Sequence, residues 1–170
     1  MKKLVLPALL ALTLAACSST GPENTGASTQ NGGAGVATVT AGSASGSGIA
    51  ALTDPNNILS KRSVFFDFDS FVIKQEARAL VEAHARFLVQ NPQMKMLVQG
   101  NTDERGSREY NLALGQKRAD VVKQALMLPG AKEAQIESVS LGEEKPRCED
   151  RTETCYAENR RGDMLYSGEF

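Results

Sequence analysis

A long stretch of small and polar residues is the feature that most restricts what this chain can fold into. From Ser18 to about Ala51 the sequence is mostly Gly, Ser, Thr, Ala and Asn, with almost nothing to bury. Such a segment cannot bury enough apolar surface to offset the entropy that it would lose on ordering. We therefore expect a flexible tether over residues 17–52 and one compact domain over residues 53–170, a length typical of a single domain.

The first residues predict export and a lipid anchor. Two lysines precede the short apolar stretch Leu4–Leu14, and the residues LAAC end at Cys17. This pattern is typical of a secretory signal, and the apolar stretch is too short to cross a bilayer as a helix. Because a cysteine directly after Leu-Ala-Ala is the pattern of a bacterial lipoprotein signal, residues 1–16 are predicted to be removed and Cys17 to be lipidated. Ser18, where retained lipoproteins carry Asp, favours anchoring in the outer membrane, with the domain facing the periplasm; the alternative is an ordinary signal with a chance cysteine.

The remaining cysteines, Cys148 and Cys155, enclose a short polar loop. An exported protein occupies a compartment that permits disulfides, so we predict that they pair, with two free thiols as the alternative. A zinc site is not expected, because the lone histidine, His84, lies far away in the sequence and no further thiols are available. No metal or other cofactor is predicted. The net charge of −1 and the absence of a basic stripe also argue against a nucleic-acid partner.

Apolar periodicity predicts alternating strands and helices in the domain. Strands are expected at 63–68, 94–102, 135–141 and 160–166, and helices at 74–90 and 108–128. This βαβαββ order predicts an α/β (α+β) two-layer sandwich, in which one mixed sheet carries the helices on a face. His84 falls on the apolar stripe of the first helix and is expected to be a core residue.

The second helix carries an arginine on its inward stripe. At 100° per residue, Arg118 and Asn111 share a face with Leu114 and Val122. Arginine is rarely buried without an anionic partner, and its planar fork suits a carboxylate. The residues alone leave two interpretations open: a functional cation aimed at a ligand, or a structural ion pair, for instance with Asp103 or Glu104.

Two aspartates end the first predicted strand, in the sequence VFFDFDS. An Asp-x-Asp pair at Asp67 and Asp69 is the pattern of phosphatases that transfer phosphate to the first aspartate and hold magnesium with later acidic residues. Phe71 occupies the position where those enzymes usually carry Thr or Val, and Glu143–Glu144 is a poor match for the later acidic pair. The domain is also too small for their usual core. An enzyme is therefore not expected.

Four segments follow one another in the order found in OmpA-like peptidoglycan-binding domains: VFFDFDSFVIKQEA, VQGNTDERGSREYNLALGQKRADVV, VSLGEEKP and ENRR. The resemblance covers roughly Val64 to Tyr166. The chain most resembles the stand-alone lipoproteins of this family that work with the Tol system in envelope integrity and cell division.

The resemblance implies a binding site and its ligand. Asp103 is expected to meet the ammonium of meso-diaminopimelate in a peptidoglycan stem peptide, and Arg118 the carboxylate on the same carbon. Phe68, Asp69 and Leu114 are expected to form the rest of the pocket. The resemblance further implies TolB and other Tol proteins as partners, or, in the alternative, a wall-binding lipoprotein outside that system.

Two details at the C-terminal end belong to the same comparison. The residues Asn159, Arg160 and Arg161 match the family's NRR and are expected to lock the last strand to the sheet. Gly162 departs from the branched apolar residue that we would expect next, which leaves the detailed pairing of that strand open.

Overall fold

The computed structural model describes residues 49–170. The predicted signal peptide, the predicted lipidation site Cys17 and the tether up to residue 48 lie outside the described residues. A short helix, α1 (Ala50–Thr53), buries the side chains of Ala51 and Leu52. Leu52 belongs to the same apolar core as the rest of the domain, so packing includes the last residues of the stretch assigned to the tether.

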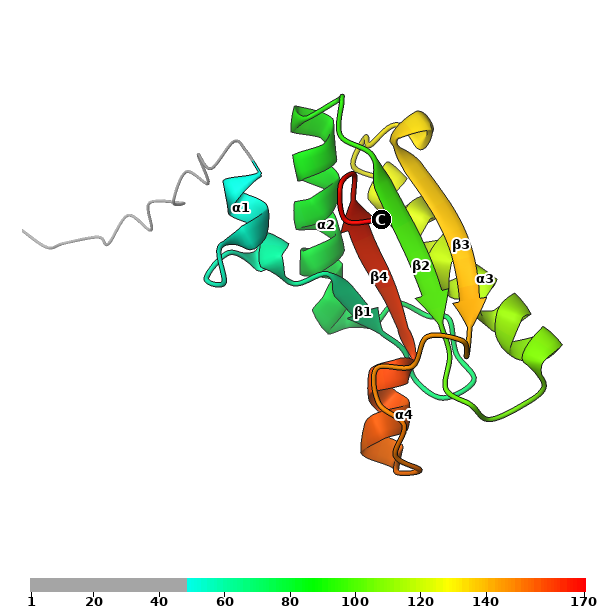
Figure 1. Cartoon of the computed structure of the whole chain (residues 1–170). Helices are drawn as coiled ribbons and strands as arrows, with labels where there is room; N and C mark the ends of the chain where they lie inside the picture. The colour runs from blue at the N-terminus through cyan, green and yellow to red at the C-terminus, as the bar shows by residue number, and fades with distance from the viewer. Residues whose placement is uncertain (1–48) are drawn as a thin grey trace, which may run out of the picture. The chain divides into compact units, whose positions relative to one another are not determined.

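A four-stranded mixed sheet forms the centre of the described part, in the order β1-β4-β2-β3 (Figure 1). Its strands are β1 (Ser63–Phe65), β2 (Met96–Asn101), β3 (Ile136–Gly142) and β4 (Arg161–Tyr166). Strand β4 runs antiparallel to both β1 and β2, whereas β2 and β3 are parallel. The predicted mixed sheet is confirmed.

Two long helices, α2 (Gln75–Gln90) and α3 (Arg108–Met127), pack against the sheet and against each other. Helix α3 makes the crossover that the parallel pair β2 and β3 requires (Figure 1). Val64, Val98 and Met164 share a core with Leu88 of α2 and Val122 of α3. These apolar side chains form one layer between sheet and helices, which confirms the α/β two-layer sandwich.

The lone histidine lies in this core, as its place on the apolar stripe predicts. His84 is fully buried, and its ring nitrogens lie 2.8 Å from the Tyr166 hydroxyl and 2.8 Å from the Lys61 carbonyl oxygen. Burial lowers the pKa of His84 to about 4, so the ring is neutral at physiological pH. Its two hydrogen bonds satisfy a polar group that would otherwise be costly inside the core.

Two glycines let α3 approach β2 unusually closely. A Cβ atom on Gly100 would lie 1.8 Å from the carbonyl oxygen of Gly115, and one on Gly115 would lie 2.8 Å from the carbonyl oxygen of Gly100. No side chain fits there. The close approach places the inward face of α3 against the C-terminal end of β2, where the side chain of Arg118 reaches the carbonyl of Asn101.

The strand and helix bounds agree with the prediction except at two places. Strand β1 ends at Phe65, so the predicted strand 63–68 is too long at its C-terminal end. Helix α4 (Glu153–Asn159) lies between the predicted strands 135–141 and 160–166, where only a polar loop was expected, and its N-cap Thr152 accepts a hydrogen bond from the backbone N–H of Cys155. This helix is short and contains too few apolar residues to show helical periodicity in the sequence.

Strand β4 pairs regularly at Gly162, which lies opposite Val64 of β1 and Gly100 of β2. A Cβ atom there would lie 3.4 Å from Val122 of α3. The pairing that the sequence left open at this glycine is therefore regular on both sides of the strand. The glycine leaves space for α3.

The predicted disulfide between Cys148 and Cys155 is present, with the two Cα atoms 5.4 Å apart. It joins the loop before α4 to the first turn of that helix. In the chain-entropy description, closing a loop of this length stabilises the fold by about 2.5 kcal/mol. We expect the double variant Cys148→Ser/Cys155→Ser to lose about that much free energy of unfolding in urea titrations. The wild-type protein under reducing conditions should match the double variant; an unchanged midpoint in both would show that the bridge does not stabilise the domain.

Candidate functional site

A cavity of about 200 Å³ opens where β2 leads into α3. The loop after β1, the loop after β2, the first half of α3 and Arg160 before β4 line it. All five residues that the family resemblance implicates border this one cavity: Phe68, Asp69, Asp103, Leu114 and Arg118. Side chains separated by up to fifty positions in sequence are thus brought together.

Arg118 lies fully buried at this cavity. Its Nε donates to the carbonyl of Ser70 at 2.8 Å, and its two Nη atoms donate to the carbonyls of Asn101 at 2.9 Å and Asp67 at 3.2 Å. A guanidinium carries five N–H donors. Three are used here, and the other two have no acceptor among residues 49–170. The fold therefore holds the group rigidly while leaving part of its donor capacity available.

The charge of Arg118 is retained despite its burial. Burial lowers the pKa of the guanidinium to about 10, and the negative charge of Asp103 opposes this effect. The side chain is a cation at neutral pH. The structural ion pair with Asp103 or Glu104, left open by the sequence, is not formed, because all three hydrogen bonds of Arg118 end on backbone carbonyls.

Asp103 is also buried, and two other arginines hold it. Its Oδ2 accepts hydrogen bonds from Arg105 at 2.6 Å and from Arg160 at 3.1 Å, and its Oδ1 accepts from the backbone N–H of Arg105 at 3.2 Å. Desolvation raises the pKa of the Asp103 carboxyl, but the hydrogen bonds from Arg105 and Arg160 outweigh it and hold the pKa below its ordinary value. The carboxylate is therefore ionised at every physiological pH.

Arg105 partly covers Asp103. Its guanidinium lies between the rings of Phe68 and Tyr156, 4.2 Å and 4.3 Å from their centroids. It also pairs with Glu153 of α4 at 3.2 Å. The Nε atom is buried and has no partner within the described part of the chain. Arg105 is thus held by stacking and ion pairs on a half-exposed side chain. Of the charged groups at the cavity, it can most readily change its partners.

Asp69 and Tyr110 form the exposed rim. Asp69 has a positive φ of 51°, a conformation that aspartate tolerates better than most residues. Its carboxylate accepts a hydrogen bond from the Tyr110 hydroxyl across the cavity mouth. A second carboxylate thus stands at the same opening as Asp103.

The two aspartates of the Asp-x-Asp pair, Asp67 and Asp69, have different surroundings and do not line one common site. Asp69 borders the cavity, whereas Asp67 is exposed and pairs with Lys74 at 2.6 Å. Among residues 49–170, no three His, Cys, Asp or Glu side chains come close enough together to hold a metal ion. In the same part of the chain, no helix has the length and apolar character needed to cross a membrane.

The chain belongs to the OmpA family, whose pattern it matches over residues 65–160. Its relatives include proteins named peptidoglycan-associated lipoprotein. The one from Pasteurella multocida is 47% identical over 104 residues, which cover 61% of this chain and 69% of the relative. The one from Pseudomonas putida is 39% identical over 163 residues, which cover 92% of this chain and 93% of the relative.

A solved structure supports the same relationship. The crystal structure of the peptidoglycan-associated lipoprotein from Burkholderia pseudomallei is 54% identical to this chain and superimposes with a TM-score of 0.68. The match covers 69% of this chain and 99% of that one. The predicted membership of the OmpA-like family and the predicted fold are both confirmed.

Several residues that line the cavity were not assigned to the site from the sequence, among them Thr102, Arg105, Tyr110 and Arg160. Arg160 was expected to lock the last strand, and its Nε does donate to the Phe66 carbonyl at 3.2 Å. Its Nη1, however, donates to Asp103. Arg105 follows Asp103 by two residues, within the segment DERG, and an excess of charge in that short loop is the signal that could have identified it.

Proposed function

We propose that this chain binds peptidoglycan non-covalently through meso-diaminopimelate and is not an enzyme. The observation that carries the proposal is the pairing, at one cavity, of a buried carboxylate on Asp103 with a buried guanidinium on Arg118. The distal carbon of diaminopimelate bears one ammonium and one carboxylate. A site that distinguishes this carbon needs one anion and one donor fork on rigid supports, and both are present.

The two charges of the ligand are assigned to two different groups that line the cavity. The ligand carboxylate accepts from the two N–H groups of Arg118 that have no acceptor among residues 49–170. The ligand ammonium donates to Asp103, whose two oxygens can accept about four hydrogen bonds. Asp69 at the rim adds a second negative charge near the ammonium, and Leu114 provides apolar contact.

Arg105 must yield when the ligand ammonium arrives. It shares Asp103 with Arg160, and its hydrogen bond occupies an acceptor position that the ligand ammonium needs. Because the ligand ammonium replaces Arg105 at Asp103, the favourable free energy of binding is reduced. A single site therefore binds the ligand only modestly. Many tethered copies on one polymer compensate through high effective concentration.

Together with the predicted lipid anchor, binding to peptidoglycan would link the outer membrane to the cell wall. Lipid on Cys17 would hold the chain in the outer membrane with the domain in the periplasm, and the glycine- and serine-rich segment would let the domain reach the wall. More than one acyl chain is required for a stable anchor. In this way the chain tethers the outer membrane to the cell wall. The names of its relatives support this proposal.

A place in the Tol–Pal system of envelope integrity and cell division is part of the proposal, with TolB and other Tol proteins as partners. The alternative is an OmpA-like lipoprotein that binds the wall outside that system. Co-purification of TolB with the chain, reduced by competing wall fragments, distinguishes the two. Magnesium-dependent hydrolysis of phosphate esters that is lost in Asp67→Asn would instead support the phosphatase alternative.

The ligand assignment predicts selectivity between wall types. A soluble stem peptide with lysine in place of diaminopimelate lacks the distal carboxylate and leaves Arg118 without its acceptor. Stranding a buried charged donor costs at least about 1.4 kcal/mol, so we expect the lysine peptide to bind about tenfold more weakly. Calorimetric titration of both peptides measures the difference. Equal affinities would show that Arg118 does not contact the distal carboxylate.

A further inference from the structure

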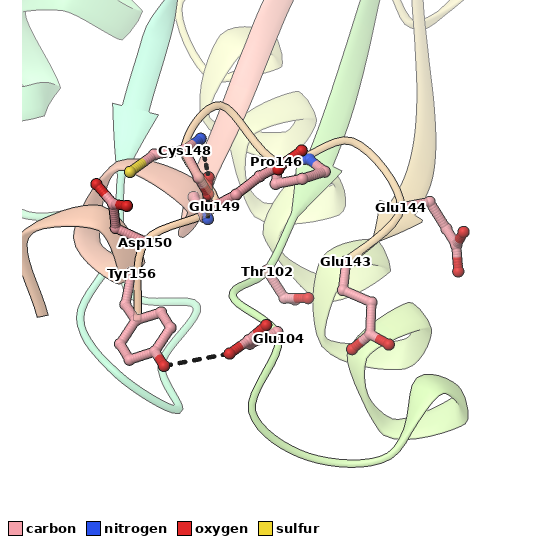
Figure 2. Close-up of a pocket in the computed structure, with 10 residues that line it drawn as sticks. Thr102, Glu104, Glu143, Glu144, Pro146, Cys148, Glu149, Asp150 and Tyr156 are labelled. Atoms are coloured by element: carbon pink, nitrogen blue, oxygen red, sulfur yellow. Dashed lines mark hydrogen bonds between the residues drawn. The ribbon is translucent and has the colours of Figure 1, made fainter. Parts of the chain in front are cut away.

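A second cavity, of about 440 Å³, lies on the other side of Thr102 from the proposed wall-binding site. We call it the acidic cavity because five carboxylates line it. They come from the loop after β2, the turn after β3 and the disulfide loop: Glu104, Glu143, Glu144, Glu149 and Asp150. Figure 2 shows these side chains, with Glu104 and Glu143 near Thr102 and Glu144 pointing away from it.

Thr102 provides an independent sign that this cavity receives a ligand. The residue is only 3% exposed, and its hydroxyl has no hydrogen-bond partner among residues 49–170. It lines the acidic cavity, and in Figure 2 its hydroxyl points toward the side that Glu143 forms. A buried hydroxyl without a partner is costly, and such groups in native proteins usually have a functional reason. A donor arriving in the cavity would satisfy it.

The carboxylates are only weakly neutralised within the described part of the chain. Glu144 pairs with Arg108 at 3.0 Å and Glu104 with Arg151 at 3.3 Å, but both arginine side chains are largely exposed. Exposed pairs of this kind contribute little and exchange readily. Glu143 accepts from the neutral amide of Asn111.

The disulfide loop contributes the two carboxylates with the least compensation. Glu149 and Asp150 have no hydrogen bond or ion pair with any residue from 49 to 170. The bridge between Cys148 and Cys155 holds the loop that carries them. The cavity therefore gathers five carboxylates around one buried hydroxyl that has no partner among residues 49–170.

These features select an organic cation. A metal ion does not fit, because no three acidic side chains in residues 49–170 converge closely enough to bind one. The stem peptide that occupies the proposed wall site also fits poorly. Its ammonium is already used at Asp103, and its other ionisable groups are carboxylates that the acidic cavity would repel. A lysine ammonium or an arginine guanidinium supplies several donors for Thr102 and the carboxylates.

The structure points to a partner protein as the source of this cation. We infer that the acidic cavity binds a lysine or arginine side chain carried by an extended basic segment of a partner protein. The volume is large enough for a whole side chain, and Pro146 offers apolar surface for its methylene stem. Because Thr102 lines both cavities, such a segment would lie directly beside wall peptide bound at Arg118. The exclusion of the stem peptide rests on the proposed wall-binding function, whereas the choice of an organic cation does not.

Titration of a labelled, capped peptide of sequence Gly-Lys-Gly-Lys-Gly with the full chain tests the inference by fluorescence anisotropy at low ionic strength. We expect saturable binding that is absent when both lysines are acetylated. The double variant Glu149→Gln/Asp150→Asn should weaken binding about fivefold or more, because two ionic contacts are lost. Thr102→Val, which keeps the shape but removes the hydroxyl, should weaken it about threefold.

A charge-matched control separates a site from general attraction. Glu82→Gln/Glu137→Gln removes two exposed carboxylates that do not line the cavity and should bind the peptide as the wild type does. Equal weakening in both double variants, or equal binding of the acetylated peptide, would overturn the inference.

Cosedimentation of Glu149→Gln/Asp150→Asn with purified peptidoglycan tests whether the acidic cavity binds the wall polymer instead of a protein. We expect wild-type sedimentation. A tenfold loss would assign the acidic cavity to the wall polymer and overturn its assignment to a protein partner. Failure of wall binding in the wild-type chain would instead count against the proposed function and leave the peptide result intact.

Discussion

Replacing Arg118 by lysine is expected to weaken binding to diaminopimelate-type peptidoglycan about 100-fold, although the positive charge is kept. The guanidinium holds its position through three backbone carbonyls and has two further N–H groups to offer the ligand. An ammonium has three donors in a different geometry and cannot serve both purposes. The loss of one or two charge-assisted bonds, each about 1.5–3 kcal/mol, accounts for the effect. Cosedimentation with purified sacculi over a range of protein concentrations measures it.

The matched control is Arg108→Lys, which makes the same change on the same helix outside the wall-binding cavity. Arg108 is exposed and, among residues 49–170, forms an ion pair only with Glu144, so sedimentation should not change. Because Arg118 also supports the fold, Arg118→Lys should lower the free energy of unfolding by about 1–3 kcal/mol, measured by urea titration. Binding assays must therefore be made under conditions in which the variant stays folded, well below its unfolding midpoint. Full binding by a folded Arg118→Lys variant would show that the guanidinium is structural only.

Replacing Asp103 by asparagine is the second large effect, because it removes the buried anion while keeping its shape. Wall binding is expected to fall about 30-fold or more, since the ligand ammonium loses a charge-assisted acceptor. Arg105 and Arg160 also lose their shared carboxylate, so the variant should be destabilised by roughly 3 kcal/mol, as expected when one partner of a buried pair is removed. Calorimetry with a diaminopimelate stem peptide and thermal unfolding measure the two effects separately.

Asp67→Asn is the control for this change. Asp67 carries an exposed carboxylate on the neighbouring loop, its side chain pairs with Lys74, and only its backbone carbonyl reaches Arg118. Peptide affinity should therefore be unchanged. If Asp67→Asn and Asp103→Asn reduced affinity equally, general negative charge rather than the buried carboxylate would be responsible.

The direction of the pKa shift at Asp103 also predicts the pH range of binding. The pKa is held below its ordinary value of 3.8, so the stability that the ionised group contributes is present above that value. It is lost only as the pH falls below 3.8 and through the folded-state pKa. Wall binding should therefore be the same at pH 5 and pH 7. A fall in affinity at pH 5 that is absent in Asp103→Asn would show that the carboxyl titrates higher than the structure indicates.

The two long helices and the inward arginine could be predicted from the sequence because they depend on local periodicity. A rotation of 100° per residue places Asn111 and Arg118 on one stripe, and both are buried. The partners of Arg118 could not be found in this way. They are backbone carbonyls of Ser70, Asn101 and Asp67, and no side-chain pattern identifies a carbonyl acceptor from another part of the chain.

Tertiary packing explains the other gaps. The close approach of Gly100 to Gly115 involves two elements whose register is decided only when sheet and helix meet. Helix α4 is short and polar, and it lies in a segment that a disulfide constrains, so its propensity signal is weak. Arg105 and Arg160 are part of the site because the loop after β2 and the residue before β4 both reach Asp103. The sequence shows their charges but not this convergence.

The central claim is that Asp103 and Arg118 bind the two opposite charges on one carbon of diaminopimelate. A crystal structure of the chain with a diaminopimelate stem peptide tests it most directly. We expect the ligand carboxylate within hydrogen-bond distance of the Arg118 guanidinium and the ligand ammonium within that distance of the Asp103 carboxylate, with the hydrogen bond between Arg105 and Asp103 broken. A complex in which Asp103 still pairs only with Arg105 and Arg160, while the peptide lies elsewhere on the domain, would contradict it.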